Sequence, residues 1–202
     1  MDSRVVIGIC SGGTIRTETM ASVIGAMMYY ARKTDTIPNI LFQIGGYVDL
    51  NRNKIIDTAL KNKASHVMFI DADMTFPEDG ILKLLNQKKP IIGGNYNVRL
   101  DPYSKSGTGP VTKMKVDNEV VSMLAKDFPT EPFQCYAIAT GFMLIDLSIL
   151  KKMDKPYFRA WIDANENHYT EDVQFCHDAN EAGFEVWCDP TIKIGHIGST
   201  VY

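Results

Sequence analysis

Two aspartates, Asp71 and Asp73, stand one residue apart at the end of an apolar run in the segment His66–Pro77, which reads H-V-M-F-I-D-A-D-M-T-F-P. Such a run predicts a strand that is buried on both faces. The two carboxylates should then emerge together at the carboxyl end of the strand, where open α/β sheets bind ligands. Carboxylates this close repel each other, and a hard divalent cation relieves the repulsion. An Asx-type turn that caps the next helix is the alternative, and both interpretations can hold together.

Two cations, Arg52 and Lys54, are expected in the first turn of a helix that spans Asn51–Lys63. The helix macrodipole disfavours positive charge at that position. The phosphates of a nucleotide would compensate, because this helix begins beside the aspartates and its own N–H groups favour an anion. A pair of solvated surface cations is the alternative.

Glycines occur at two points where a ligand would need room. The S-G-G-T segment that starts at Ser11 and Gly12 follows the first expected strand and leaves space for a base or a phosphate. It is neither a G-x-G-x-x-G motif nor a P-loop, so the segment alone is weakly informative. Gly141 interrupts a strong strand pattern, which indicates a bulge, close approach of a ligand, or tight packing.

Acidic residues and a histidine occur late in the chain. Glu171 and Asp172 are expected at the first two positions of a helix that has Thr170 as its N-cap and ends at Gly183. The helix dipole favours acids there for structural reasons alone, and it also keeps a carboxylate ionised for use as a base or as an acceptor-positioning group. His196 is flanked by glycines, so it is either structural or a neutral imidazole that reaches a metal ion.

The elements that must position these residues alternate between strand and helix in the first half of the chain. This alternation predicts βαβ units and an α/β fold with a mainly parallel central sheet and helices on both faces. The expected strands are Arg4–Cys10, Asn39–Gly45, His66–Asp71 and Pro90–Gly94, and the expected helices are Thr17–Lys33, Asn51–Lys63 and Pro77–Gln87.

The alternation breaks after Tyr96, and we expect a small mixed or antiparallel part in the C-terminal region. A polar loop at 97–110 precedes a hairpin around Asp117–Asn118, and the chain returns to the core at Cys135–Leu147. A long loop in a compact domain is usually functional, often as a lid over a site, and disorder is the alternative. Late strands are expected at Phe184–Cys188 and Thr191–Ile194.

Composition limits the class of protein. The chain has 202 residues, of which 45% are hydrophobic and 22% charged, as in a single globular domain with a full core. Its net charge of -3 argues against a broad nucleic-acid footprint. The sequence contains neither an apolar stretch that would span a membrane nor a secretory segment before the first strand, so we expect a cytoplasmic protein. The widely spaced cysteines predict reduced, mostly buried thiols, at Cys10, Cys135, Cys176 and Cys188.

Taken together, these residues resemble a nucleotide-sugar-dependent glycosyltransferase of the GT-A fold, along almost the whole chain. The D-x-D at Asp71 and Asp73 resembles the family's metal motif, and G-H-I-G around His196 resembles a segment that supplies a third metal ligand. The resemblance implies Mn²⁺, or alternatively Mg²⁺, held against the donor diphosphate by these three residues. The chain is most similar to compact glycosyltransferase-like proteins of bacteriophages and large DNA viruses, which would place it in a host cytoplasm.

Other motifs match the family in the same order. N-R-N-K at Asn51–Lys54 resembles the helix start that contacts the nucleotide, and G-F-M-L-I at Gly141–Ile145 resembles the segment that lines the sugar pocket. T-E-D at Thr170–Asp172 looks like the E-D motif, which makes Asp172 and Glu171 the implied catalytic residues. The implied contacts to the donor are Ser11, Gly12, Arg52, Lys54, Asp71, Ala72 and Gly141.

The resemblance implies one GT-A domain over residues 1–202, with a nucleotide-binding half at 1–96 and a half for the sugar and acceptor at 97–202. It implies a hexosyltransferase that uses a nucleoside-diphosphate sugar, with a UDP-sugar favoured, and a glycan or glycoprotein acceptor. The chain ends six residues after His196, where many relatives continue. Acceptor recognition is therefore expected from the 97–110 loop, from Tyr157–His168, or from a further domain of a longer polypeptide.

Two other interpretations stay open. F-I-D-A-D-M-T also fits the nucleophile motif of haloacid-dehalogenase-type phosphatases, although that motif normally follows the first strand and here two βα units precede it. A sugar-nucleotide-binding module that has lost turnover is the second alternative, since a shared fold does not establish activity.

Overall fold

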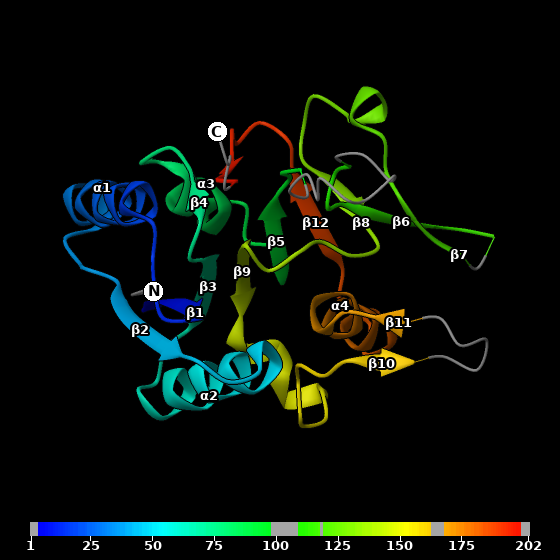
Figure 1. Ribbon diagram of the computed structural model, residues 1–202, viewed down its shortest axis with the longest axis horizontal. Helices are drawn as coiled ribbons and strands as arrows, with labels where there is room; N and C mark the ends of the chain where they lie inside the picture. The colour runs from blue at the N-terminus through cyan, green and yellow to red at the C-terminus, as the bar shows by residue number, and fades with distance from the viewer. Residues whose placement is uncertain (1–3, 98–108, 118, 163–167, 199–202) are drawn as a thin grey trace.

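The computed structural model describes residues 4–97, 109–117, 119–162 and 168–198. A seven-stranded sheet lies at its centre, in the order β2-β1-β3-β9-β5-β12-β8. These strands are β1 (Val5–Ser11), β2 (Asn39–Ile44), β3 (His66–Asp71), β5 (Ile91–Gly94), β8 (Phe133–Cys135), β9 (Phe142–Asp146) and β12 (Val186–Asp189). The helices are α1 (Thr17–Thr34), α2 (Val48–Lys61), α3 (Gly80–Asn86) and α4 (Glu171–Glu181). Figure 1 shows α1 and α3 on one side of the sheet and α2 and α4 on the other.

The sheet is mostly parallel, as the strand and helix alternation predicted. β1 pairs in parallel with both β2 and β3, and β5 pairs in parallel with β12. β9 lies antiparallel between β3 and β5, and β8 lies antiparallel at the edge beside β12. Because β9 belongs to the second half of the sequence and separates two strands of the first half, the two halves share one sheet.

The central strands are apolar throughout because helices cover both of their faces. In β3, residues Val67 to Ile70 are each at most 2% exposed, and Phe142 to Ile145 of β9 are buried to the same degree. Strands enclosed on two faces need continuous apolar runs, without the alternation of a strand that is solvated on one face. The run that ends at Asp71 therefore lies at the centre of the core, and its last residue reaches the edge of the sheet.

Several expected boundaries are shifted by one or two residues, and three expectations differ more than that from the structure. Helix α2 begins at Val48, before the expected Asn51, and α3 begins at Gly80, because a turn closed by a hydrogen bond from the Gly80 N–H to the Pro77 carbonyl (3.0 Å) precedes it. The expected strand at Thr191–Ile194 is wrong. There the Asp189 carboxylate accepts hydrogen bonds from the backbone N–H (2.9 Å) and the hydroxyl (2.6 Å) of Thr191, which forms a turn.

Short antiparallel pairs make up the rest of the described strands, as expected for the C-terminal part. They are β4 (Met74–Thr75) with β13 (Gly195–His196), β6 (Lys113–Val116) with β7 (Glu119–Ser122), and β10 (Trp161–Ile162) with β11 (His168–Tyr169). Short 3₁₀-helices occupy Ala125–Asp127 and Leu147–Lys152. The β6–β7 pair confirms the expected hairpin. Asn118, most of the 97–110 loop and residues 163–167 lie outside the described residues.

All four cysteines are free in the structure, and all but Cys10 are buried, as the prediction of mostly buried thiols required. Within the described part of the chain, no helix combines the length and the apolar character that crossing a membrane requires.

Candidate functional site

A cleft of about 910 Å³ lies where β1 and β3 end, within the size range of small-molecule sites. Its walls come from the loop after β1, the turn before α2, one face of α2 and the residues that follow β3. Seven of the predicted site residues line it, namely Ser11, Gly12, Arg52, Asp71, Ala72, Asp73 and Glu171. The other predicted residues are not among its lining residues, namely Lys54, Gly141, Asp172 and His196.

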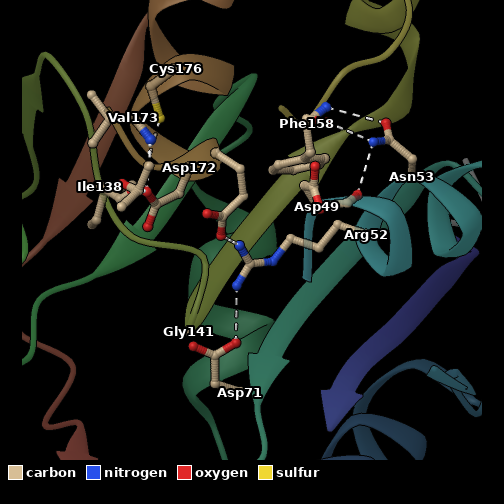
Figure 2. Close-up of polar contacts among 12 residues, drawn as sticks. Asp49, Arg52, Asn53, Asp71, Ile138, Gly141, Phe158, Asp172, Val173 and Cys176 are labelled. Carbon is tan, nitrogen blue, oxygen red and sulfur yellow. Dashed lines mark hydrogen bonds and ion pairs between the residues drawn. The ribbon is translucent and has the colours of Figure 1, made fainter. Parts of the chain in front are cut away.

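Arg52 is the cation at the centre of this site. It is 4% exposed, and its guanidinium pairs with Asp71 Oδ1 at 3.2 Å (Figure 2). The same guanidinium also pairs with the carboxylate of Glu171. Because α2 begins at Val48, Arg52 lies in its second turn, so the expected placement in the first turn is wrong. A buried cation requires charged partners, and two carboxylates supply them. The alternative of a solvated surface cation is therefore wrong for Arg52, whereas Lys54 is exposed.

The loop after β1 has internal hydrogen bonds of its own. The Ser11 hydroxyl donates to the Thr14 carbonyl (2.6 Å) and accepts from the Gly13 N–H (3.1 Å), so Ser11 shapes the loop. Gly12 is exposed, and a side chain placed there would meet no atom of the described chain within 4 Å. The cleft wall at Gly12 is therefore open, as a bound nucleotide would require.

Gly141 lies behind Asp71 and contacts Tyr96. A Cβ at Gly141 would overlap the Tyr96 hydroxyl and approach Asp71 Oδ2 to 3.1 Å. The Gly141 N–H donates to the Tyr96 oxygen at 3.0 Å, and its carbonyl accepts from the Asp71 N–H at 3.1 Å. Of the three interpretations of this glycine, tight packing is the one that these contacts favour. The hydrogen bond from the Asp71 N–H to the Gly141 carbonyl fixes the backbone from which the Asp71 side chain extends.

Tyr96 is a residue that the sequence analysis missed. Burial, and then the nearby carboxylates of Asp71 and Asp172, raise the pKa of Tyr96 well above 10.0, so its hydroxyl stays protonated. Its ring packs edge to face against the ring of His196, with centroids 5.4 Å apart. The one feature of the sequence that could have indicated Tyr96 as a site residue is its position two residues after the Gly-Gly pair that ends a strand.

His196 and Asp73 come together through the pairing of β13 with β4. The His196 Nε2 lies 3.5 Å from Asp73 Oδ1, and the His196 Nδ1 lies 3.0 Å from the carbonyl of Asn97. A neutral imidazole that donates from Nδ1 to a carbonyl presents the lone pair of Nε2. In that tautomer, two electron-pair donors face each other, which suits a shared cation. With a proton on Nε2, the same contact is an ion pair.

The three predicted metal ligands, Asp71, Asp73 and His196, are not all arranged to hold a metal ion. In the described ranges, no group of three or more His, Cys, Asp or Glu side chains is arranged to hold a metal ion. Asp73 and His196 provide two ligands of the types that Mn²⁺ accepts. Asp71 is the predicted third ligand, but its Oδ1 is paired with Arg52.

The two acidic residues at the start of α4 have different surroundings. Glu171 lines the cleft and pairs with Arg52. Asp172 is half-buried, and its Oδ1 accepts from the Val173 N–H (2.8 Å, Figure 2). The same oxygen accepts from the Thr170 hydroxyl. Asp172 thus stabilises the first turn of its own helix.

Cys10, a second residue that the sequence analysis did not place in the site, also lines the cleft. Burial is the main cause that raises the pKa of its thiol from 9.0 to about 11. Since the thiolate and not the thiol is the reactive form, Cys10 is a poor nucleophile at neutral pH. The charged groups that line the cleft are the carboxylates of Glu18, Asp71, Asp73 and Glu171 and the guanidinium groups of Arg16 and Arg52.

Comparisons with known proteins give a fold and no family. No family model matches the sequence, and no curated protein matches it. Among solved structures, the chain is similar to the crystal structure of A197 from STIV, with a TM-score of 0.64, 19% identity, and 97% of this chain and 86% of that chain covered. A Bacillus anthracis protein assigned as a glucose-1-phosphate thymidylyltransferase, crystallised with a sucrose, matches with a TM-score of 0.42, 14% identity, and coverage of 91% and 89%. The similarity to A197 shows a common fold.

Proposed function

We propose that this chain is a metal-dependent glycosyltransferase that moves a sugar from a nucleoside-diphosphate sugar, with a UDP-sugar favoured, to a glycan or glycoprotein acceptor. The observation that supports this most is the convergence of Asp73 and His196, from distant parts of the sequence, next to a cleft of nucleotide size that Asp71 also lines. In open α/β sheets this edge is where nucleotides bind.

In this proposal Asp73 and His196, with Asp71, hold Mn²⁺ or alternatively Mg²⁺. When bound, the ion neutralises charge on the departing nucleoside diphosphate and orients it. In this proposal, residues of the chain itself bind and orient the nucleotide. The open wall at Gly12 accommodates the nucleotide, and Arg52 holds Asp71 and Glu171 in place while it supplies positive charge beside the phosphates.

Glu171 and Asp172 are the candidates for the general base that removes a proton from the acceptor. Glu171 lines the cleft, so its carboxylate is the one within reach of a bound substrate. Asp172 does not line the cleft, and its Oδ1 accepts a hydrogen bond from the Val173 N–H. We therefore assign the base role to Glu171 and a supporting role to Asp172.

Titration calorimetry tests the metal part of the proposal. We expect UDP to bind more tightly with Mn²⁺ than without it, and we expect Asp73→Asn and His196→Ala each to abolish that difference. Asp35→Asn is the matched control, because Asp35 is an exposed carboxylate in a left-handed conformation that asparagine tolerates. Equal UDP and GDP affinities with and without Mn²⁺ would rule out the metal assignment.

The two alternatives give different results with the same protein. A haloacid-dehalogenase-type phosphatase would release phosphate from a simple monoester without any sugar nucleotide. A binding module would bind a nucleotide sugar tightly, yet neither hydrolyse nor transfer it across a range of acceptors. Transfer of a radiolabelled sugar to an acceptor distinguishes the proposed enzyme from both.

A further inference from the structure

A second pocket, of about 120 Å³, lies between α4, the β10–β11 hairpin and the strand β6. It shares no lining residue with the cleft. Half of its lining residues carry aromatic rings, and the others are two valines and two polar residues. The residues that matter here are Lys115, Tyr136, Trp161, Tyr169, Gln174 and His177.

The aromatic wall is a set of stacked rings with an exposed indole. Trp161 stacks on Tyr169, with ring centroids 5.1 Å apart, and on His177, with centroids 5.4 Å apart and planes only 6° from parallel. The Tyr136 hydroxyl fixes His177 by a 2.8 Å hydrogen bond to Nδ1. Trp161 nevertheless remains 36% exposed. A rigid, partly exposed indole offers a large apolar contact surface at low entropic cost.

Gln174, which also lines this pocket, has a buried acceptor without a hydrogen-bond partner among the described residues. It is 2% exposed, and its Nε2 donates to Asp178 Oδ1 at 2.6 Å. A carboxylate can only accept, so this contact fixes which end of the amide is the oxygen. The other end, Oε1, is buried and has no hydrogen-bond partner among the residues that the structure describes. A buried acceptor without a partner is costly, so such groups point to a missing donor.

An apolar ring surface next to an unpaired acceptor matches the chemistry of a sugar. One face of a pyranose carries C–H groups that pack on an aromatic ring, and its hydroxyls are hydrogen-bond donors. We propose that this pocket binds one pyranose ring of the glycan acceptor, packed on Trp161, with a hydroxyl donating to Gln174 Oε1. Its role as an acceptor subsite rests on the proposed glycosyltransferase function, whereas sugar binding there does not.

The position of the pocket in the chain fits an acceptor subsite. Tyr169 lies two residues before Glu171, which lines the cleft, so their Cα atoms are at most about 7 Å apart. Gln174 and His177 lie on α4, the helix that begins at Glu171. A glycan held on Trp161 could therefore extend toward Glu171, the group that we assign as base.

Intrinsic fluorescence tests the proposal directly. The chain has two tryptophans, so Trp187→Phe leaves Trp161 as the single reporter. In this background we expect cellobiose, lactose, chitobiose or mannobiose to change the Trp161 emission with a saturable dependence on concentration, in the absence of any nucleotide or metal. No saturable change with any of the four saccharides, or a change with uridine alone, would overturn the proposal.

Two variants in the same background locate the binding. We expect Gln174→Met, which keeps the shape and removes the acceptor, to weaken saccharide binding about 5-fold, the effect of one neutral hydrogen bond. Trp161→Ala, followed by calorimetry because the reporter is lost, should weaken it at least about 10-fold. Tyr29→Ala on α1 is the control and should leave the affinity unchanged. If both pocket variants bind saccharides as tightly as the parent protein, the proposal is overturned. Thermal melts confirm that each variant is folded.

The outcomes separate this inference from the proposed function. If UDP binds without regard to Mn²⁺ while saccharides bind at Trp161, the metal-dependent transferase is wrong and the sugar subsite stands. If metal-dependent UDP binding is found and no saccharide binds, the subsite is wrong and the transferase stands.

Discussion

Arg52 shows how the surroundings of one side chain decide its role. A guanidinium that is 4% exposed has lost most of its hydration. It is stabilised by a charge-assisted hydrogen bond to Asp71 and by an ion pair with Glu171. Arginine suits the position better than lysine, since its planar group can face two carboxylates at once. Arg52 therefore joins α2, the end of β3 and the start of α4 into one wall of the cleft.

We expect Arg52→Ala to lower the free energy of unfolding by about 3 kcal/mol, near the low end of the range for breaking a buried ion pair, because one partner, Asp71, is about one-third exposed. Urea denaturation measures this. Lys54→Ala on the same helix is the control, and as an exposed substitution it should change stability by less than about 0.5 kcal/mol. Equal unfolding curves for the two variants would mean that the Arg52 pairs contribute nothing.

The two acidic residues at the start of α4 give a second test at the level of single residues. We expect Glu171→Gln to lower the rate of sugar transfer by roughly 100-fold or more, the usual worth of a positioned general base. Asp172→Asn should have a smaller effect, because an amide oxygen can still accept from the Val173 N–H. Transfer rates at saturating donor decide between them. The reverse order would assign the base to Asp172, which would then have to turn into the cleft.

Among the elements, the smallest pairing has the greatest effect on the proposed metal site. β13 and β4 are two residues long, and their register places Gly195 opposite Thr75 and His196 opposite Met74. A further hydrogen bond, from the Ile197 N–H to the Asp73 carbonyl (2.8 Å), ties the same two segments together. His196 therefore reaches Asp73 only while the backbones stay this close. The glycine at 195 permits this approach, since a Cβ there would overlap the Thr75 hydroxyl.

We expect Gly195→Ala to weaken Mn²⁺ binding about 10-fold, as changes that displace a metal ligand without removing it typically do. Thr75→Ala removes the atom that the new methyl group would meet, so the double variant Gly195→Ala/Thr75→Ala should recover most of the affinity. Calorimetry with Mn²⁺ on all three variants forms the cycle. A double variant as weak as Gly195→Ala would show that overlap with Thr75 is not the cause.

For the whole molecule, the groups with raised pKa values limit stability at alkaline pH. Burial is the first cause that raises the pKa of Cys10 to about 11, of Cys188 to about 11 and of Cys176 to about 12, from 9.0. A group whose pKa is higher in the folded state binds its proton there while the unfolded chain has lost it. Its contribution to stability is full below the pKa of the unfolded chain and is lost as the pH rises toward the folded value.

We therefore expect the free energy of unfolding to fall from about pH 9 upward, by on the order of 2 kcal/mol for a buried thiol such as that of Cys188. The raised pKa of Tyr96 adds a loss in the same direction above its ordinary value of 10.0. Urea denaturation under reducing conditions over this pH range measures the slope. Tyr96→Phe should flatten the upper part of the curve, and a stability that does not change above about pH 9 would contradict the prediction.

The sequence by itself determined the features that depend on neighbours along the chain. The apolar run before Asp71 predicted a buried central strand, and the structure confirms that strand as β3. The alternation of strands and helices predicted a mostly parallel α/β sheet, and the acidic pair after Thr170 predicted the start of α4. Hydrophobic periodicity and helix caps act over a few residues, so these features can be inferred without knowing what surrounds them.

Only the tertiary structure decided which partners these residues meet. The pairing of Arg52 with Glu171, the contact of Gly141 with Tyr96 and the stacking of Trp161 on His177 each join segments that are distant in the sequence. The position of β9 between β3 and β5 likewise depends on how all the strands of the sheet pair. Burial and the local dielectric environment set the charge state and the hydrogen-bond needs of such groups, and both depend on the packing of the complete fold, not on local sequence.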